Sequence, residues 1–362
     1  MTKISKFAAL TIPLAISYSP IMTAKDHGSV PDAETDPFGR RSKMQRHKSL
    51  QLLGASIRFE SNSPLLLGLV DSAYQGLPAH RLSTKSPQLR IRLQLCSRGR
   101  AHGVSEAAPL ALFANAGCLG AATDSSSLVV LSPKERSGLV RVSAEMSRFP
   151  YHARYELIEF AVFTLASAAQ GLVPLHAACV GSDGSGILLM GASGAGKSTV
   201  ALQCLLRGLE FVSEDSVFVH PGKMLATGVA NFLHVGSDSL RWLEGSPTAA
   251  AIRSSPVIRR RSGAKKFELD LRGGRFRLAK APLKIIGIAF LSPKKAGADP
   301  LVLPLSKPDL RRRLIAEQPF GAAQPEWRRF SDNASALHGF ELRRGQHPLE
   351  AVEALRALLS RR

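Results

Sequence analysis

The sequence predicts an α/β fold in two parts, a small α+β domain followed by a larger domain that contains a glycine-rich loop. Three observations lead to this prediction. The chain has 362 residues, about the length of two ordinary domains. Residues 89–95 alternate between apolar and polar side chains, as half-buried strands do. Residues 187–190 form an apolar segment that leads directly into the glycine-rich loop and then into a helical segment.

The chain divides into three expected regions. These are a poorly ordered leader at residues 1–48, the small α+β N-terminal domain at 49–150 and the larger domain at 151–362. In the leader, Lys3 and Lys6 precede an apolar run that Pro13 and Pro20 interrupt. The run is similar to a signal peptide but has no clear cleavage site, and it is too short to span a membrane as a helix. A signal, a start site assigned too far upstream and a disordered leader stay open as alternatives.

Hydrophobic patterns predict the elements of both domains. In the first, a helix begins at Pro64, a residue favoured in the first turn, and extends to Tyr74. Strands are expected at residues 55–60, 89–95, 128–131 and 139–142. In the second, apolar residues at helical spacing predict a helix over 155–169, which Gly171 ends. Strands at 175–180 and 187–190, joined by a turn at 181–184, follow it.

The composition excludes two classes of protein. Hydrophobic residues make up 44% of the chain and charged residues 21%, so a core can form and global disorder is excluded. The four cysteines form no C-x-x-C pair, which excludes a disulfide framework and disfavours a zinc site. This cysteine usage is typical of a reducing compartment, and we therefore expect a cytoplasmic protein.

The chain is strongly basic, with a net charge of +20. The excess lies mainly in residues 253–362, which contain 24 Lys and Arg but 10 Asp and Glu. Basic runs occur at 259–261, 265–266 and 311–313. Two interpretations stay open, a solvated basic face and a docking surface for an acidic substrate. Aromatic residues make up only 6% of the chain and do not alternate with these runs, so nucleic-acid and membrane partners are disfavoured.

The strongest motif is the loop G-x-x-x-x-G-K-S, which stands between the apolar strand and a helix expected over 199–207. Glycines let backbone N–H groups point inward at phosphate oxygens, and the helix N-terminus adds partial positive charge. Lys197 would then contact the β- and γ-phosphates, and the Ser198 hydroxyl would ligate Mg²⁺. The motif predicts a Mg-ATP site, with a chance glycine-rich turn as the alternative. The predicted nucleotide-binding residues are Gly191, Ala192, Ser193, Gly194, Ala195, Gly196, Lys197, Ser198 and Thr199.

Two adjacent carboxylates, Glu214 and Asp215, follow the helix after a short predicted strand. One carboxylate can hold Mg²⁺, and the other can accept the proton of an attacking hydroxyl group. We assign Asp215, together with Ser198, to the metal and Glu214 to the proton. The alternative is a solvent-exposed acidic pair in a turn. The chain has no L-S-G-G-Q signature, which argues against a transporter ATPase.

Residues 176–219 resemble the catalytic core of the HPr kinase/phosphorylase family. Its members carry a His in the first strand, a G-x-S-G-x-G-K-S loop and an R-G-H-x-L-V-x-D-D segment. This chain has His176, the loop at 191–198 and the segment RGLEFVSED at 207–215. The resemblance extends loosely over residues 151–350. It implies a phosphoenolpyruvate-carboxykinase-like P-loop kinase core and phosphorylation of a serine hydroxyl with Mg-ATP.

The resemblance also suggests a role for His176. The matching position in the family lies near the phosphates, where a histidine would orient the acidic pair or neutralise charge in the transition state. A histidine satisfied within the core is the alternative. The predicted catalytic residues are therefore His176, Lys197, Glu214 and Asp215.

Three departures from the family pattern limit what it implies. The chain has Glu214 where the family has Asp, and Thr199 where the sugar-uptake regulators have Glu. It also lacks the R-G-x-G signature tied to phosphorylase activity, so we expect net kinase activity with little phosphorolysis. The expected acceptor is an acidic or serine-bearing protein or peptide, a peptide natural-product precursor included. Two alternatives are an ATP-binding regulatory or scaffold protein without transfer activity and a small-metabolite kinase. The oligomeric state stays open, with a homo-oligomer as one option.

Overall fold

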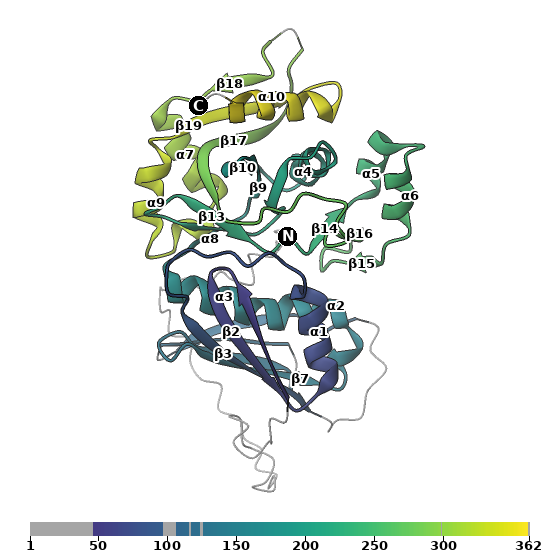
Figure 1. The fold of residues 1–362 in the computed structure, drawn as a ribbon, viewed down its shortest axis with the longest axis vertical. Helices are drawn as coiled ribbons and strands as arrows, with labels where there is room; N and C mark the ends of the chain where they lie inside the picture. The colour runs from purple at the N-terminus through teal and green to yellow at the C-terminus, as the bar shows by residue number, and fades with distance from the viewer. Residues whose placement is uncertain (1–45, 97–105, 116, 124–125, 298, 361–362) are drawn as a thin grey trace, which may run out of the picture.

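The computed structural model describes residues 46–96, 106–115, 117–123, 126–297 and 299–360. These residues form a mixed α/β structure with a seven-stranded, a nine-stranded and a three-stranded sheet. Figure 1 shows the seven-stranded sheet and its helices below the nine-stranded sheet, with the three-stranded sheet at the side of the latter. Within the described ranges, no helix is both long and apolar enough to cross a membrane.

The seven-stranded sheet has the order β1-β2-β3-β7-β6-β5-β4. Its strands are β1 (Arg46–Leu52), β2 (Ala55–Ser61), β3 (Gln88–Cys96), β4 (Ala111–Asn115), β5 (Cys118–Ala122), β6 (Leu128–Ser132) and β7 (Ser137–Ser143). The helix predicted at residues 64–74 is confirmed as α1 (Pro64–Tyr74), and the four predicted strands are confirmed as β2, β3, β6 and β7. The sequence patterns did not indicate β1, β4 or β5.

The predicted end of the leader is wrong by a few residues. Strand β1 begins at Arg46 and pairs antiparallel with β2, so that Arg46 lies opposite Ser61. The chain is therefore already part of the sheet before residue 49. The rest of the predicted leader, residues 1–45, lies outside the described residues, and so do the alternatives proposed for it.

The helix predicted at 155–169 packs against the first sheet, although we expected it to belong to the second domain. It consists of a π-helical segment, η3 (Ala153–Ile158), that continues into α3 (Glu159–Gln170). Gly171 ends it with a φ of +59°, as predicted. Its apolar residues are buried in the same core as those of the seven-stranded sheet, Leu165 among them. By packing, the helix thus belongs with the first sheet, although we expected it in the second domain.

The nine-stranded sheet has the order β11-β9-β10-β17-β13-β12-β8, and β19 and β18 extend it beyond β17. Its strands are β8 (Val173–Leu175), β9 (Ala178–Ser182), β10 (Ser185–Met190), β11 (Glu210–Ser213), β12 (Val217–His220), β13 (Leu225–Gly228), β17 (Leu283–Lys295), β18 (Val302–Pro304) and β19 (His338–Arg344). Strands β10, β17 and β19 run parallel.

Helices cover both faces of this sheet. Because side chains alternate along a strand, Ile187 and Leu189 of β10 share a core with α4 (Lys197–Leu206) and α10 (Pro348–Ser360). Leu188 and Met190 instead pack in the core that contains residues of α7 (Lys307–Glu317) and α9 (Trp327–Ala334). Two-sided burial explains why the segment before the glycine-rich loop is apolar throughout.

The single strand predicted at 175–180 is wrong. Strand β8 ends at Leu175 and pairs with β12, whereas β9 begins at Ala178 and pairs with β10 and β11. His176 and Ala177 form the link between them. The link brings His176 to the end of β9 that lies beside the end of β11, where Ser213 pairs with Cys179.

The three-stranded sheet has the order β14-β16-β15 and was not expected from the sequence. Its strands are β14 (Phe232–Val235), β15 (Val257–Arg259) and β16 (Lys265–Asp270). Between β14 and β15 lie the short helices α5 (Ser237–Leu240), η4 (Arg241–Leu243) and α6 (Pro247–Arg253). Apolar residues of β14 and β16 share a core with α4, so this sheet lies against the helix that follows the glycine-rich loop.

Candidate active site

The glycine-rich loop connects β10 to α4 and depends on backbone conformations that favour glycine. Gly191, Gly194 and Gly196 have φ values of +144°, +86° and +102°, in the range where other residues are strained. Gly191 also lies close to the next strand, since a Cβ atom there would be 3.0 Å from the carbonyl oxygen of Leu291. The loop can therefore fold tightly over the end of the sheet.

Lys197 is the first residue of α4, and its side chain turns back into the loop. Its Nζ donates hydrogen bonds to the carbonyl oxygens of Gly191, at 2.6 Å, and Ala192, at 3.3 Å. Only 7% of the residue is exposed. Burial lowers the pKa of this ammonium, while the negative charges of Asp215 and Glu317 act in the opposite direction. A buried cation thus stands at the helix N-terminus, where anions bind favourably.

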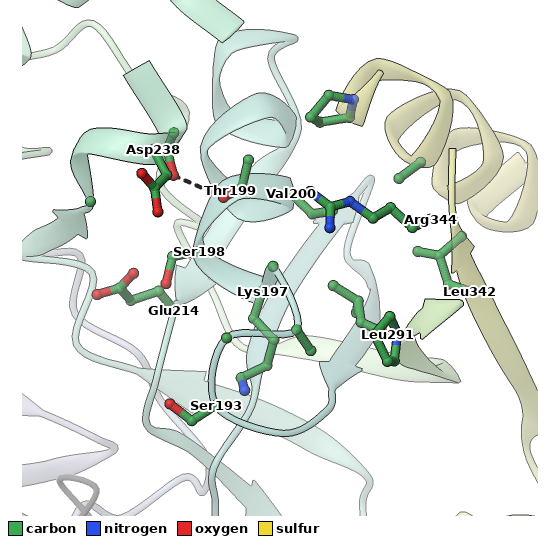
Figure 2. A pocket seen from close by; sticks show the side chains of 18 of the residues that line it. Ser193, Lys197, Ser198, Thr199, Val200, Glu214, Asp238, Leu291, Leu342 and Arg344 are labelled. Atoms are coloured by element: carbon green, nitrogen blue, oxygen red, sulfur yellow. Dashed lines mark hydrogen bonds between the residues drawn. The ribbon is translucent and has the colours of Figure 1, made fainter. Parts of the chain in front are cut away.

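A cavity of about 520 Å³ opens beside this loop (Figure 2). Most of the sequence-predicted site residues line it, among them His176, the acidic pair and Ser193 through Thr199. Gly191 and Ala192 do not line it, because they form the base of the loop to which Lys197 binds. The hydroxyl of Thr199 lies 2.8 Å from that of Ser239, so α4 is linked to α5 at the cavity wall.

His176 and Asp215 meet in this cavity. His176 Nε2 lies 2.9 Å from Asp215 Oδ1, and Arg260 Nη2 approaches Asp215 Oδ2 at 3.7 Å. The geometry places His176 beside the acidic pair, in line with the role suggested for it. Arg260 is a member of the basic run at 259–261, and no feature of that run distinguished it from its neighbours.

The backbone of His176 is fixed by a side chain from far along the sequence. Gln318 accepts a hydrogen bond from His176 N–H at 2.8 Å and donates one to its carbonyl oxygen at 3.1 Å. These are the two bonds that a neighbouring strand would make, and the link between β8 and β9 lacks such a neighbour. Gln318 is itself only 3% exposed. No sequence pattern indicated this residue.

Glu214 is held from one side only. Its Oε1 accepts hydrogen bonds from His234 Nδ1, at 2.9 Å, and from the backbone N–H of His234, at 3.0 Å. Its other oxygen, Oε2, is buried and has no hydrogen-bond partner within the described ranges. Burial alone would raise the pKa of Glu214, but the hydrogen bond and charge of His234 lower it. Glu214 is therefore an ionised carboxylate with one oxygen occupied and one available.

The other side of the cavity combines apolar side chains with a cationic one. Figure 2 shows Leu291, Leu342 and Arg344 on the far side of Lys197 from Glu214. Trp242 and His347 also line the cavity, and their ring centroids lie 4.8 Å apart with an edge-on orientation. Planar rings, apolar side chains and a buried lysine in one cavity match the chemistry of a nucleotide.

The predicted magnesium ligands can be tested against the same geometry. Mg²⁺ binds oxygen ligands, usually one or two carboxylates together with substrate phosphates and waters. The Ser198 hydroxyl and the Asp215 carboxylate line one cavity, so both predicted oxygen ligands face the same space. These residues fit an ion that also binds substrate phosphates and waters. Among the described residues, no group of three or more His, Cys, Asp or Glu side chains could hold a metal ion.

The basic runs are largely engaged with the protein itself. Arg261 pairs with Glu156 at 2.6 Å, and Arg259 pairs with Glu106 at 3.0 Å. In the run at 311–313, all three arginines pair with carboxylates of the same chain. Within the first two runs, only Arg260 and Lys266 line the cavity. Within these two runs, Arg260 and Lys266 are therefore the side chains placed to steer an acidic acceptor.

No protein-family model and no curated protein matches the chain. Among solved structures, the HPr(Ser) kinase/phosphatase from Coxiella burnetii matches with a TM-score of 0.26 and 14% sequence identity. The match covers 51% of this chain and 95% of that chain. Similarity of this size leaves the function to be argued from the cavity itself.

Proposed function

We propose that the chain is an ATP-dependent phosphotransferase that phosphorylates a hydroxyl group of a protein or peptide. One observation carries the proposal. The buried ammonium of Lys197, bound to the glycine-rich loop, shares a cavity with the acidic pair and His176. A loop and helix N-terminus with a buried lysine suit a phosphate chain, and nearby carboxylates suit a transfer reaction.

The residues of the loop bind and orient the nucleotide. Backbone N–H groups of the loop and the start of α4 bind phosphate oxygens, and Lys197 supplies a positive charge. Lys197 bonds to loop carbonyl groups at present, and its flexible stem allows it to turn toward a phosphate. Trp242 and His347 line the same cavity and provide planar rings against which the base of the nucleotide would stack.

The two carboxylates have different surroundings, and this supports different roles. Glu214 has a fixed orientation and one oxygen without a hydrogen-bond partner among the described residues, and its lowered pKa keeps it ionised, so it can accept the proton of the acceptor hydroxyl. Asp215 instead lies 2.9 Å from His176 and 3.7 Å from Arg260. When Mg²⁺ is bound, Asp215 and the Ser198 hydroxyl would hold it, and the ion would neutralise phosphate charge.

The acceptor enters beside the acidic pair. Arg260 and Lys266 line the cavity there, and two cations beside the acidic pair suit an acceptor with carboxylates near its hydroxyl group. This arrangement supports an acidic protein or peptide as the acceptor.

The binding step is tested with Lys197→Ala, which removes the buried cation. Calorimetry should show loss of Mg-ATP binding. Lys223→Ala is a matched control, because Lys223 also donates to a backbone carbonyl oxygen, that of Leu82 at 2.7 Å, but does not line the cavity. The control should bind Mg-ATP like the parent. Parent-like binding and turnover by Lys197→Ala would contradict the proposal.

The transfer step is tested with Glu214→Gln. This variant should keep Mg-ATP binding and lower ATP turnover by about 10²–10⁴-fold, the range expected for a general base. The measurement is ADP formed from Mg-ATP. An ATP-binding scaffold would show no turnover that depends on Glu214. A phosphorylated metabolite in place of a phosphorylated peptide would favour the small-metabolite kinase.

A further inference from the structure

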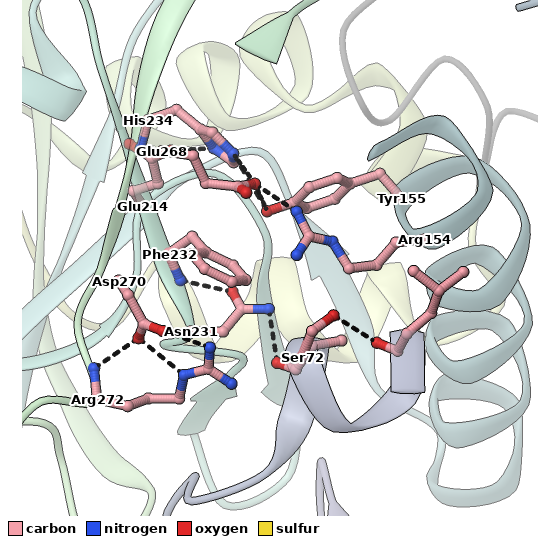
Figure 3. Close-up of polar contacts among 12 residues, drawn as sticks. Ser72, Arg154, Tyr155, Glu214, Asn231, Phe232, His234, Glu268, Asp270 and Arg272 are labelled. Carbon is pink, nitrogen blue, oxygen red and sulfur yellow. Dashed lines mark hydrogen bonds and ion pairs between the residues drawn. The ribbon is translucent and has the colours of Figure 1, made fainter. Parts of the chain in front are cut away.

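A buried network of charged and aromatic side chains stands behind Glu214 (Figure 3). It consists of His234 on β14, Glu268 on β16, and Arg154 and Tyr155 on η3. His234 is 1% exposed, and Arg154 and Glu268 are each 7% exposed. Burial of charged groups costs folding free energy unless each of them is paired. A cluster of this kind is therefore a candidate for a functional role.

The first contact of the network fixes the carboxylate of Glu214. Both hydrogen bonds from His234, one from the ring and one from the backbone, go to the same oxygen, Oε1. A carboxylate oxygen accepts hydrogen bonds, so in this contact the ring donates from Nδ1. Two donors on one oxygen set the rotation of the carboxylate, and Oε2 has no hydrogen-bond partner among the described residues.

The remaining contacts fix the ring of His234. Its Nε2 lies 3.2 Å from the hydroxyl of Tyr155 and 3.4 Å from Glu268 Oε1. The same oxygen of Glu268 accepts hydrogen bonds from Tyr155, at 3.0 Å, and Arg154, at 2.5 Å. The ring is therefore held at both nitrogens, and it cannot rotate without breaking contacts on both sides.

Two members of the network, Arg154 and Tyr155, lie on a helical segment that packs against the seven-stranded sheet. Arg154 and Tyr155 are consecutive, and both reach the network from the π-helical segment η3. π-helical turns are rare and frequently occur at functional sites. The guanidinium of Arg154 also stacks on Phe232, with 4.5 Å between its carbon and the ring centroid. The seven-stranded layer thus reaches the catalytic cavity through this segment.

We propose that His234 is a positioning residue for Glu214, and that Arg154 and Tyr155 of the preceding layer hold it in place through Glu268. The inference rests on the proposed function, since it assigns a purpose to the orientation of the proton acceptor. The layer of the first sheet then contributes to the transfer step itself, although none of its residues lines the cavity.

The test compares two variants of His234 whose amide side chains each replace one of the two ring nitrogens. In His234→Asn, the amide can donate to Glu214 from near the place of Nδ1. In His234→Gln, the longer side chain reaches toward Glu268 and leaves Glu214 without its side-chain donor. We expect His234→Gln to lower kcat for ATP turnover by about 10²-fold, the effect of a displaced reacting group, without changing KM for ATP. His234→Asn should retain most of kcat.

A buried histidine outside the cavity provides the matched control. His80 is 5% exposed and bonds to Thr227 at 2.8 Å and to the carbonyl oxygen of Ala279 at 2.9 Å. His80→Gln should lower stability but leave kcat and KM unchanged. Equal kcat in His234→Gln and His234→Asn, or an equal loss in His80→Gln, would overturn the inference.

Two further measurements keep the inference testable. If His234→Gln does not fold, Tyr155→Phe removes one contact to the ring and should lower kcat by about 2- to 10-fold, the value of one hydrogen bond. A crystal structure of His234→Gln should show the Glu214 carboxylate turned from its present orientation, and an unmoved carboxylate would refute the inference. This second result does not depend on activity. A parent protein without ATP turnover would instead refute the proposed function.

Discussion

The side chain of Gln318 takes the place of a missing strand beside His176, and its replacement makes a quantitative prediction. Gln318→Met keeps the length of the side chain but removes both hydrogen bonds to His176. A buried backbone group without a partner costs about 1–3 kcal/mol, so two such groups set a range of about 2–6 kcal/mol. Since His176 is only half-buried, water can reach one of them, and we expect about 2–3 kcal/mol.

The assay is urea denaturation of the parent and the variant. A matched control is Gln324→Met, because Gln324 lies nearby at the end of α8 (Pro319–Ala322) and makes a single bond of 3.3 Å to the carbonyl oxygen of Phe320. We expect the control to change the free energy of unfolding by less than about 0.5 kcal/mol. Equal stabilities of the two variants would refute the reasoning, because the bonds to His176 would then contribute nothing.

The substitution Gln318→Met should also affect ATP turnover. His176 Nε2 lies 2.9 Å from Asp215 Oδ1, so a shift of the link between β8 and β9 moves the histidine away from this carboxylate. Gln318→Met should therefore lower ATP turnover as well as stability, while Gln324→Met should change neither. A destabilised variant with parent-like turnover would show that the position of His176 is unimportant for transfer.

Two further predictions concern charge. Burial would raise the pKa of Glu268, but the hydrogen bond from His234 and the charge of Arg154 lower it to about 2. A lowered pKa stabilises the fold above the ordinary value of 4.5, and this stability is lost as the pH falls toward 2. Glu268→Gln should therefore remove about 2 kcal/mol of acid-dependent stability in urea titrations between pH 6 and 3. In the basic run, Arg261→Gln should lower the free energy of unfolding by about 1–3 kcal/mol, because it breaks charged hydrogen bonds to Glu156 and to the carbonyl oxygen of Ala108. Arg259→Gln should lower it by less than about 0.5 kcal/mol, because both members of its ion pair are more than 60% exposed. Equal losses in the two arginine variants would count against the separation of the run into structural and exposed members.

Local patterns predicted the elements that the chain forms with its near neighbours. The alternation at 89–95 indicated β3, the proline before residue 65 indicated the start of α1, and Gly171 indicated the end of α3. The glycine-rich loop was also readable, because strand, loop and helix are consecutive in the sequence. Each of these signals acts over a few residues, where backbone sterics and side-chain period decide the structure.

Contacts between distant segments could not be predicted in this way. Gln318 lies 142 residues from His176, and no sequence period connects them. His234 stands in a strand of four residues within a sheet that the patterns did not indicate. The interruption at His176 was also missed, because an apolar run in a buried strand looks the same whether or not its pairing changes midway.

The adjacent acidic residues show why a dipeptide can supply two chemical roles. Successive side chains at the end of a strand point to opposite sides, and Glu214 and Asp215 follow β11 directly. Glu214 therefore turns toward β14 and is fixed by His234, whereas Asp215 turns toward His176 and Arg260. The two carboxylates are neighbours in sequence but contact different side chains. Different surroundings separate the properties of two like groups, so the order of Glu and Asp after β11, and not only their presence, supports the separate roles proposed for them.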